Sequence, residues 1–413
     1  MAPLCRRCAR PSDMRDLSAG PRRKLDTQSA SCSISHRQMQ ALTAPMITLS
    51  ERDTFQKEPH GGTPMIPSSL RRVAGLVAGF AAAVALAFPA TAQQKDKIRI
   101  AAQVWYPSFP QFTAMDQGIY AKWGLDPEMK VYPSGAPIVQ AAATDEWDVA
   151  HIGAPPTIQG YKLGLIIAGV ISEEAVMHQL IGRPDWVDAA RKDAAKIKGA
   201  KVFITTASTG HFMVEACLKK RGMSMNDIQV LPSEQQAALS AFIAGNGELA
   251  QLWAPQTTAA RGRGMKVLCD GTEASLKIPS VWVIHPNFAK KNPDAAVRWL
   301  RATLEGVAWA QVDRKRTDAL YRKWDQFRGT QTPDEFLKEE IDLAVDLWPI
   351  KKQIEAMKGV NGRKAYVYEA LEDITGFYSR IGRMKEPLEQ AKASVNKLVD
   401  TSWLDKAAAL PAR

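Results

Sequence analysis

Cysteine is scarce in this chain, and no apolar run is long enough to cross a bilayer. Three of the five cysteines (Cys5, Cys8 and Cys32) lie before residue 65, and no second pair follows Cys5-x-x-Cys8, so no zinc site is complete. The longest uncharged, mostly apolar run, Val73–Phe88, is shorter than the roughly 20 residues that span a membrane. The sequence therefore argues against a cysteine-ligated metal protein and against a membrane anchor.

A basic block of the kind that binds nucleic acid is also missing. The chain carries 54 Lys and Arg against 43 Asp and Glu, but residues 1–92 hold 12 of the basic and 6 of the acidic residues, which leaves 42 against 37. No basic stretch interleaved with aromatic residues occurs in that remainder. We therefore expect no nucleic-acid partner.

The segment Met65–Ala92 has the layout of an export signal. Arg71 and Arg72 form a charged start, the apolar run Val73–Phe88 follows, and Ala90-Thr91-Ala92 offers small residues for cleavage. We expect cleavage after Ala92 and a periplasmic mature protein. Residues 1–64 would then precede the signal, and we interpret them as a leader that is either not translated or disordered.

The mature chain, which starts at Gln93, is longer than one hydrophobic core usually serves, so two lobes are expected. Strand-like and helix-like segments alternate from Lys97 to Ile284, which is typical of βα units on a mostly parallel sheet. Helices dominate from Pro293 onward. The predicted fold is α/β, with a first lobe formed by residues 93–181 and 276–413 and a second lobe formed by residues 182–275.

The two connections between these lobes, expected near Gly182 and at Gly271–Lys277, would act as a hinge. Only Cys217 and Cys269 remain in the mature chain. A disulfide and two buried thiols are both compatible with the sequence.

The segment Lys201–Cys217 predicts an apolar strand, a Ser-Thr-Gly-His turn and a helix. Ser208 and Thr209 stand where this helix would begin. Their hydroxyls, together with the free N–H groups of the first turn, would form a socket for an anion, although such residues also cap helices without any ligand. No nucleophile with a base lies nearby, so the turn indicates binding and not catalysis.

Four segments of the mature chain resemble the solute-binding proteins of ABC importers in the nitrate, sulfonate and taurine group. The resemblance rests on Asp116–Leu125, on Ser134–Pro156, on the turn Ser208–His211 and on Leu252–Pro255, in this order. It implies a two-lobe periplasmic-binding-protein fold (type II Venus flytrap) with a helical C-terminal segment. It also implies a small anionic ligand, no cofactor, no catalytic residue, no metal, a monomer, and ABC permease and ATPase subunits as partners.

The residues expected to contact the ligand come from strand ends and helix starts on both lobes. They are Gln103, Trp105, Ser134, Gly153, Pro155, Ser208, Thr209, His211, Trp253, Gln256 and Ser280. For several of them a plainer role is also compatible with the sequence: core packing for the tryptophans, a rigid turn for the proline, and a plain strand position for the serine at 280.

The expected ligand is a small organic acid, a sulfonate such as taurine or an alkanesulfonate. Many relatives carry Glu where this chain has Ala254, and the absence of that charge from the cleft fits an acidic ligand. Taurine-type relatives carry Asp where this chain has Ser280. Because a buried ammonium without a carboxylate is costly, the departure at Ser280 argues against taurine itself. The alternatives are nitrate, an aromatic carboxylate, a thiamine-type pyrimidine, or a periplasmic sensor subunit. An enzyme of thiamine-pyrimidine synthesis would need clustered histidines, whereas those at 151, 178, 211 and 285 are scattered.

Overall fold

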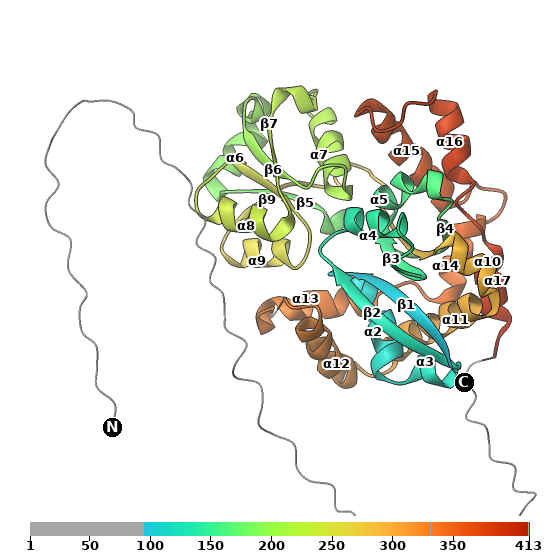
Figure 1. The fold of residues 1–413 in the computed structure, drawn as a ribbon. Coiled ribbons are helices and arrows are strands. Elements are labelled where there is room, and N and C mark those ends of the chain that lie inside the picture. Colours follow the sequence, from blue (N-terminus) through green and yellow to red (C-terminus); the bar gives the residue numbers. More distant parts are fainter. Residues whose placement is uncertain (1–94, 331, 412) are drawn as a thin grey trace, which may run out of the picture. The chain divides into compact units, whose positions relative to one another are not determined.

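Two five-stranded sheets with helices packed around them form the fold of the computed structural model (Figure 1). The structure describes residues 95–330, 332–411 and 413. The expected leader at 1–64 and the expected export signal at 65–92 lie outside the described residues. Within the described ranges, no helix is both long enough and apolar enough to cross a membrane.

The first sheet has the strand order β2-β1-β3-β10-β4. Its strands are β1 (Asp96–Gln103), β2 (Leu125–Tyr132), β3 (Val149–Gly153), β4 (Ile166–Glu173) and β10 (Pro279–Ile284). β1 runs parallel to β2 and β3, whereas β10 is antiparallel to both of its neighbours. Every residue of β3 and β10 is buried, which fits central strands covered by helices on both faces.

The second sheet repeats this plan with the order β7-β6-β8-β5-β9. Its strands are β5 (Gln179–Gly182), β6 (Lys201–Ile204), β7 (Gln229–Pro232), β8 (Leu249–Leu252) and β9 (Lys266–Asp270). β6 is parallel to β7 and β8, and β5 is antiparallel to β8 and β9. Each sheet thus holds one antiparallel strand, supplied by the chain as it arrives from the other sheet. The predicted α/β fold with two lobes is confirmed.

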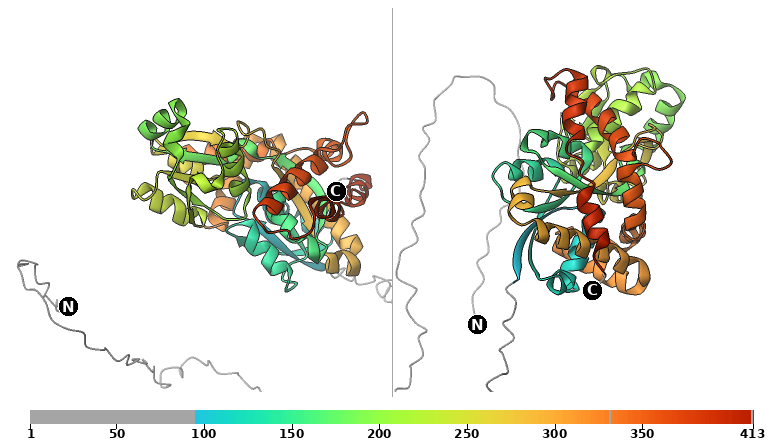
Figure 2. Two further views of the ribbon diagram at one scale, coloured as in Figure 1. Left: turned by 90° about the horizontal axis from the view of Figure 1, so that it is seen from above. Right: turned by 90° about the vertical axis from the view of Figure 1, so that its right-hand side faces the viewer.

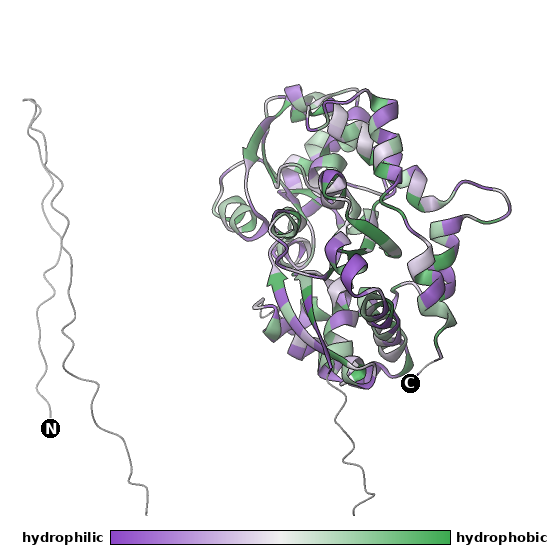
Figure 3. Ribbon diagram, turned by 45° about the vertical axis from the view of Figure 1, so that its right-hand side comes forward, coloured by the Kyte–Doolittle hydropathy of each residue, from purple (hydrophilic) through white to green (hydrophobic). Residues whose placement is uncertain are grey.

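Short helices follow most of the strands. In the first lobe they are α2 (Phe109–Asp116), α3 (Ile119–Lys122), α4 (Gly135–Ala142) and α5 (Ala154–Gln159), and in the second lobe α6 (Pro184–Lys192), α7 (Thr209–Lys219), α8 (Gln235–Ile243) and α9 (Gln256–Gly262). After β10 the chain is helical: α10 (Pro286–Lys291), α11 (Pro293–Val312), α12 (Arg314–Phe327), α13 (Asp334–Val345), α14 (Ile350–Lys358), α15 (Tyr366–Arg380), α16 (Leu388–Asn396) and α17 (Ser402–Ala409). Figure 3 shows these helices banded in polar and apolar residues.

The chain passes between the lobes at Glu174–His178 and again between β9 and β10. The first passage lies before the expected position near Gly182, because Gln179–Gly182 already forms β5, a strand too short to produce a periodic signal. The Glu173 carboxylate is hydrogen-bonded to both passages. It accepts hydrogen bonds from the N–H groups of Ala175 (3.0 Å) and Ile278 (2.9 Å).

The sequence predicts one helix over Phe112–Trp123, from its helical spacing, and a charged helix over Asp185–Lys198, and the structure interrupts both. The segment predicted at 112–123 is split into α2 and α3 at Gly118, whose φ of 66° lies in the left-handed region that glycine adopts easily. The charged segment predicted at 185–198 leaves the α-helix at Asp193 and continues as a short 3-10 turn. Helices α5, α10 and α17 were not predicted.

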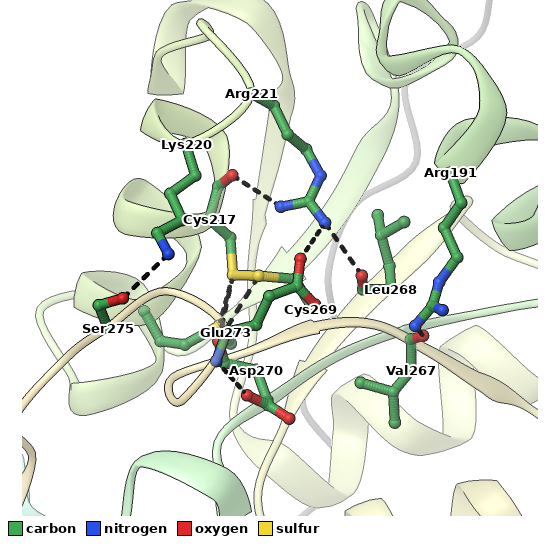
Figure 4. Close-up of a disulfide and its surroundings, with 11 residues drawn as sticks. Arg191, Cys217, Lys220, Arg221, Val267, Leu268, Cys269, Asp270, Glu273 and Ser275 are labelled. Carbon is green, nitrogen blue, oxygen red and sulfur yellow. Dashed lines mark hydrogen bonds and ion pairs between the residues drawn. A yellow bond between two sulfur atoms is a disulfide. The ribbon is translucent and has the colours of Figure 1, made fainter.

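A disulfide joins Cys217 on α7 to Cys269 on β9 (Figure 4). It decides between the two alternatives that the sequence left open. The bond lies within the second lobe, where it fastens a helix to the edge strand of the sheet. Beside it, the Arg221 guanidinium donates to the carbonyls of Cys217 (3.0 Å) and Leu268 (3.2 Å).

The C-terminal helices reach from the first lobe to the second, as the turned views in Figure 2 show. Two partly exposed ion pairs bridge the lobes: Arg380 on α15 with Glu215 on α7 (2.7 Å), and Arg261 on α9 with Glu339 on α13 (2.5 Å). Exposed pairs of this kind contribute at most about 1 kcal/mol each. These pairs therefore affect the position of one lobe against the other more than the stability of either lobe.

Candidate functional site

The carboxyl ends of strands from both sheets surround one cavity between the lobes. Such strand ends are the usual ligand sites of open α/β sheets. The cavity volume is about 20 Å³, and the empty space around it, including the part open to solvent, is about 420 Å³. The lining residues are Gln103, Trp105, Ser134, Gly135, Ala136, Gly153, Pro156, Glu174, His178, Thr205, Thr206, Ala207, Ser208, Thr209 and Trp253.

Most of the residues singled out from the sequence lie in this cavity, and some do not. Gln103, Trp105, Ser134, Gly153, Ser208, Thr209 and Trp253 line it. Pro155, His211, Gln256 and Ser280 are absent from its lining. The neighbouring Pro156 lines the cavity in place of Pro155. Both prolines lie in the first turn of α5, which begins at Ala154.

His211 does not point into the cavity. Its Nδ1 accepts a hydrogen bond from the N–H of Ala207 (3.1 Å), and its ring packs edge-on against Phe377 with ring centroids 5.1 Å apart. Burial lowers the pKa of this histidine. The ring therefore stabilises the turn before α7, and the expected hydrogen bond to an acid group has no support from this geometry.

Ser280 is outside the cavity lining and is hydrogen-bonded to another histidine, His151. Its hydroxyl is 2.5 Å from Nε2 of His151, whose Nδ1 is 2.6 Å from the hydroxyl of Ser108. The Ser108 oxygen in turn accepts the N–H of Gln103 (3.0 Å). Ser280 is fully buried in β10. The expected ligand contact is thus replaced by a buried hydrogen-bond chain that supports the end of β1.

Gln256 starts helix α9 and faces a wider cleft that borders the cavity at Trp253. Its amide lies 3.4 Å from the side-chain oxygen of Gln236, at the limit of a hydrogen bond. This places Gln256 near the entrance to the site and outside the cavity itself.

Two helix starts, one from each lobe, supply unused hydrogen-bond donors to the cavity. α4 begins at Gly135 and α7 begins at Thr209. The first N–H groups of a helix have no partner inside it, and those of Gly135, Ala136 and Thr209 donate to no other group among the described residues. Together with the helix dipoles, they favour a negatively charged or strongly polar group between them.

Side chains beside these helix starts point to a ligand as well. The Gln103 side chain is about nine-tenths buried, and its amide oxygen has no hydrogen-bond partner among the described residues. Ser134, which precedes α4, makes no capping bond to that helix. Because buried polar groups are rarely left unpaired, a polar group in the cavity would complete this site.

Ser208 behaves as the helix cap that the sequence also allowed. Its hydroxyl donates to the carbonyl of Thr205 (2.6 Å) and accepts the N–H of His211 (3.3 Å). Its hydrogen is therefore already committed. The Thr209 hydroxyl has no such bond, and it lies 3.2 Å from where a side chain at Gly153 would begin. A larger residue at 153 would crowd this contact between the lobes.

The lining contains two ionisable side chains that sequence reasoning missed, Glu174 and His178. Both lie on the passage between β4 and β5, and both are at least 95% buried. Trp105 donates its indole N–H to Glu174 (2.8 Å), and Trp105 and Trp253 both pack near the His178 ring. No motif marks this passage. A buried-looking Glu directly after an apolar strand was the only available signal.

Glu174 changes the electrostatics that the sequence suggested. Ser280 and Ala254 led us to expect a cleft without a carboxylate, yet Glu174 places one there, and no Lys or Arg belongs to the cavity lining. Among the described residues, no group of three or more His, Cys, Asp or Glu side chains is arranged to hold a metal ion.

Comparison with known proteins agrees with this architecture. A family model described as NMT1/THI5 like matches residues 107–315, about half of the chain. A putative binding protein of Brucella abortus (strain 2308) is 26% identical over 294 residues, which cover 67% of this chain and 82% of that protein. The taurine-binding periplasmic protein of Escherichia coli (strain K12) is 24% identical over 234 residues, covering 54% of this chain and 68% of that one.

A solved structure shares the fold. The crystal structure of the periplasmic aliphatic sulphonate binding protein SsuA from Escherichia coli superposes with a TM-score of 0.59 at 20% sequence identity. The match covers 72% of this chain and 91% of that structure.

Proposed function

The chain belongs to the NMT1/THI5-like family, and we propose that it is an extracytoplasmic binding protein that captures a small organic acid for an ABC importer. The observation that supports this most is the cavity between the lobes. Helix starts from both lobes face it with N–H groups that donate to no other described residue and can donate to an acid group. The Gln103 amide beside them, whose oxygen has no hydrogen-bond partner among the described residues, carries an N–H₂ that can donate to the same group.

Because residues of both lobes line the cavity, ligand binding is coupled to the movement of one lobe against the other. A ligand held by α4 of the first lobe and α7 of the second makes its full set of contacts only when the lobes meet. Contacts formed only in the closed state shift the population toward that state. The passages at Glu174–His178 and Gly271–Lys277 are the proposed hinge. A closed, loaded form is what a membrane permease would recognise.

The proposed ligand class is a small sulfonate, which agrees with what the named relatives bind. Nitrate, an aromatic carboxylate and a thiamine-type pyrimidine remain the alternatives. The proposed location is the periplasm, as a monomer that docks with ABC permease and ATPase subunits. A sensor subunit would use the same cavity with a different partner.

The cavity offers little for catalysis, in keeping with a transport role. The hydroxyl of Ser208 donates to a backbone carbonyl, and His211, the nearest histidine along the chain, accepts a backbone N–H. Within the described ranges, no hydroxyl of the cavity lining is hydrogen-bonded to a histidine side chain that could act as its base. Our proposal assigns no covalent step and no cofactor to this cavity.

Isothermal titration calorimetry against taurine, ethanesulfonate, nitrate, benzoate and an aminopyrimidine tests the proposal. Replacing Gln103 by Leu removes the amide N–H₂ that can donate to the acid, and it should weaken binding of the preferred ligand about 10- to 100-fold, since a hydrogen bond to a charged group contributes roughly 1.5–3 kcal/mol. The matched control, Gln256→Leu, lies outside the cavity and should change the affinity less than threefold. Equal effects of both variants, or no binding of any acid, would contradict the proposal.

A further inference from the structure

We infer that the cavity contains a second subsite, formed by Glu174 with Trp105 and Trp253, that binds a positively charged nitrogen of the ligand. The inference rests on the proposed function and narrows its ligand class. A ligand that fits both subsites carries an acidic group at the helix starts and a protonated nitrogen at Glu174.

Glu174 is a buried carboxylate with only part of its bonding capacity used. Its Oε1 accepts the indole N–H of Trp105 (2.8 Å) and lies 3.4 Å from the hydroxyl of Ser172. Its Oε2 accepts no hydrogen bond within the described part of the chain, and it lies 3.9 Å from Nε2 of His178. Only 2% of the residue is exposed to solvent.

A carboxylate in this position needs a positive partner. Burying an ionised group without a counter-charge is costly, and buried charges in proteins are normally paired. Among the described residues, the cavity lining contains no Lys or Arg, and Glu174 forms an ion pair only with His178, 3.9 Å away, which is charged only when its imidazole is protonated. A ligand nitrogen would supply the missing charge.

The surrounding rings suit a cation. Trp105 and Trp253 line the cavity, with ring centroids 6.1 Å and 5.7 Å from that of His178, and the Trp105 N–H also donates to the carboxylate. Indole faces attract ammonium groups through their quadrupole, more strongly when water is excluded. Both ring nitrogens of His178 lack hydrogen-bond partners among the described residues, so this side chain can adjust to a nitrogen bound beside it.

The two subsites have opposite preferences, and this decides between ligands. Nitrate or a simple alkanesulfonate would occupy the helix starts, but it would add a negative charge to a cavity that already holds one carboxylate. A zwitterion satisfies both ends. The sequence had argued against an ammonium because Ser280 on β10 replaces a carboxylate. In the structure Glu174 provides a carboxylate instead, just beyond the end of β4, the strand that pairs with β10.

Calorimetric titration of the protein, expressed from its full-length sequence, with taurine and with ethanesulfonate tests this subsite, because the two probes share the sulfonate and differ in the nitrogen. We expect taurine to bind at least tenfold more tightly. Glu174→Gln should weaken taurine at least tenfold and leave ethanesulfonate unchanged or tighter. The matched control, Glu128→Gln, removes an exposed carboxylate of β2 that lines neither the cavity nor the outer cleft, and it should change both affinities less than threefold.

The outcomes separate the two proposals. Ethanesulfonate binding as tightly as taurine, or equal losses of both probes in Glu174→Gln, overturns the cation subsite and leaves the acid-binding function standing. Ethylamine binding through Glu174 while both sulfonates fail supports the cation subsite and overturns the acid ligand. Binding of none of the three probes by folded protein overturns both. The wild-type comparison needs no variant, and Glu174→Asp provides a second one if Glu174→Gln does not fold.

Discussion

His151 should make the folded protein lose stability in mild acid. The ring is fully buried in β3, between the hydroxyls of Ser108 (2.6 Å) and Ser280 (2.5 Å). Because the Ser108 oxygen already accepts the N–H of Gln103, its own hydrogen is available for Nδ1, and Nε2–H can donate to Ser280. This arrangement satisfies a neutral imidazole, whereas an imidazolium would need an acceptor on each side.

Burial lowers the pKa of His151 to about 4, against an ordinary value of 6.5, while the Glu174 charge acts in the opposite direction. Between these two values the unfolded chain binds a proton that the folded protein does not. The free energy of unfolding therefore falls as the pH drops from about 6.5 to about 4, and the loss is complete below that range. A difference of roughly 2.5 pKa units corresponds to about 3 kcal/mol.

Urea unfolding of the wild-type protein and of His151→Gln, at pH 7 and at pH 4.5, measures this effect. Glutamine keeps one donor and one acceptor but does not titrate, and other titrating groups cancel in the difference between the two proteins. We expect the stability advantage of the wild type over the variant to shrink by about 2–3 kcal/mol between pH 7 and pH 4.5. A gap of the same size at both pH values would refute the reasoning.

Two further predictions concern the framework of each lobe. Replacing Cys217 and Cys269 together by Ala removes a disulfide that closes a loop with a sequence separation of 52 residues, and it should lower the free energy of unfolding in urea by about 2–4 kcal/mol. A reductant should lower the stability of the wild type by a similar amount and leave the variant unchanged. Unchanged stability in both tests would contradict the assignment of the disulfide. Arg328 is fully buried between Asp325 (2.6 Å) and Glu340 (2.7 Å), so Arg328→Met should destabilise by about 3–5 kcal/mol. Its control, Arg322→Met on α12, which ends just before Arg328, breaks an exposed pair and should cost under about 1 kcal/mol. Equal losses in the two variants would contradict a buried-charge effect.

The sequence was most informative where local chemistry and local structure coincide. The strand, turn and helix predicted at Lys201–Cys217 are present as β6 and α7, and Ser208 caps the helix as its side chain allows. Alternating strand and helix signals were enough to predict two α/β lobes. Breaks such as Gly118 were missed because a left-handed glycine leaves hydrophobic periodicity intact on both sides.

The site itself depended on contacts that no local pattern records. Ser280 and His151 are separated by 129 residues in sequence and meet only because β10 pairs with β3. Glu174 enters the cavity because the chain changes lobes at that point, and the passage carries no motif. The direction of the His211 ring was likewise set by the Ala207 N–H, which helical spacing does not predict.

The most direct test of the account is a crystal structure of the protein with taurine. We predict that the sulfonate lies between the starts of α4 and α7, within hydrogen-bond distance of the Thr209 N–H, and that the ammonium lies against the Glu174 carboxylate. A ligand found outside this cavity, or bound there with its sulfonate toward Glu174, would contradict the central claim.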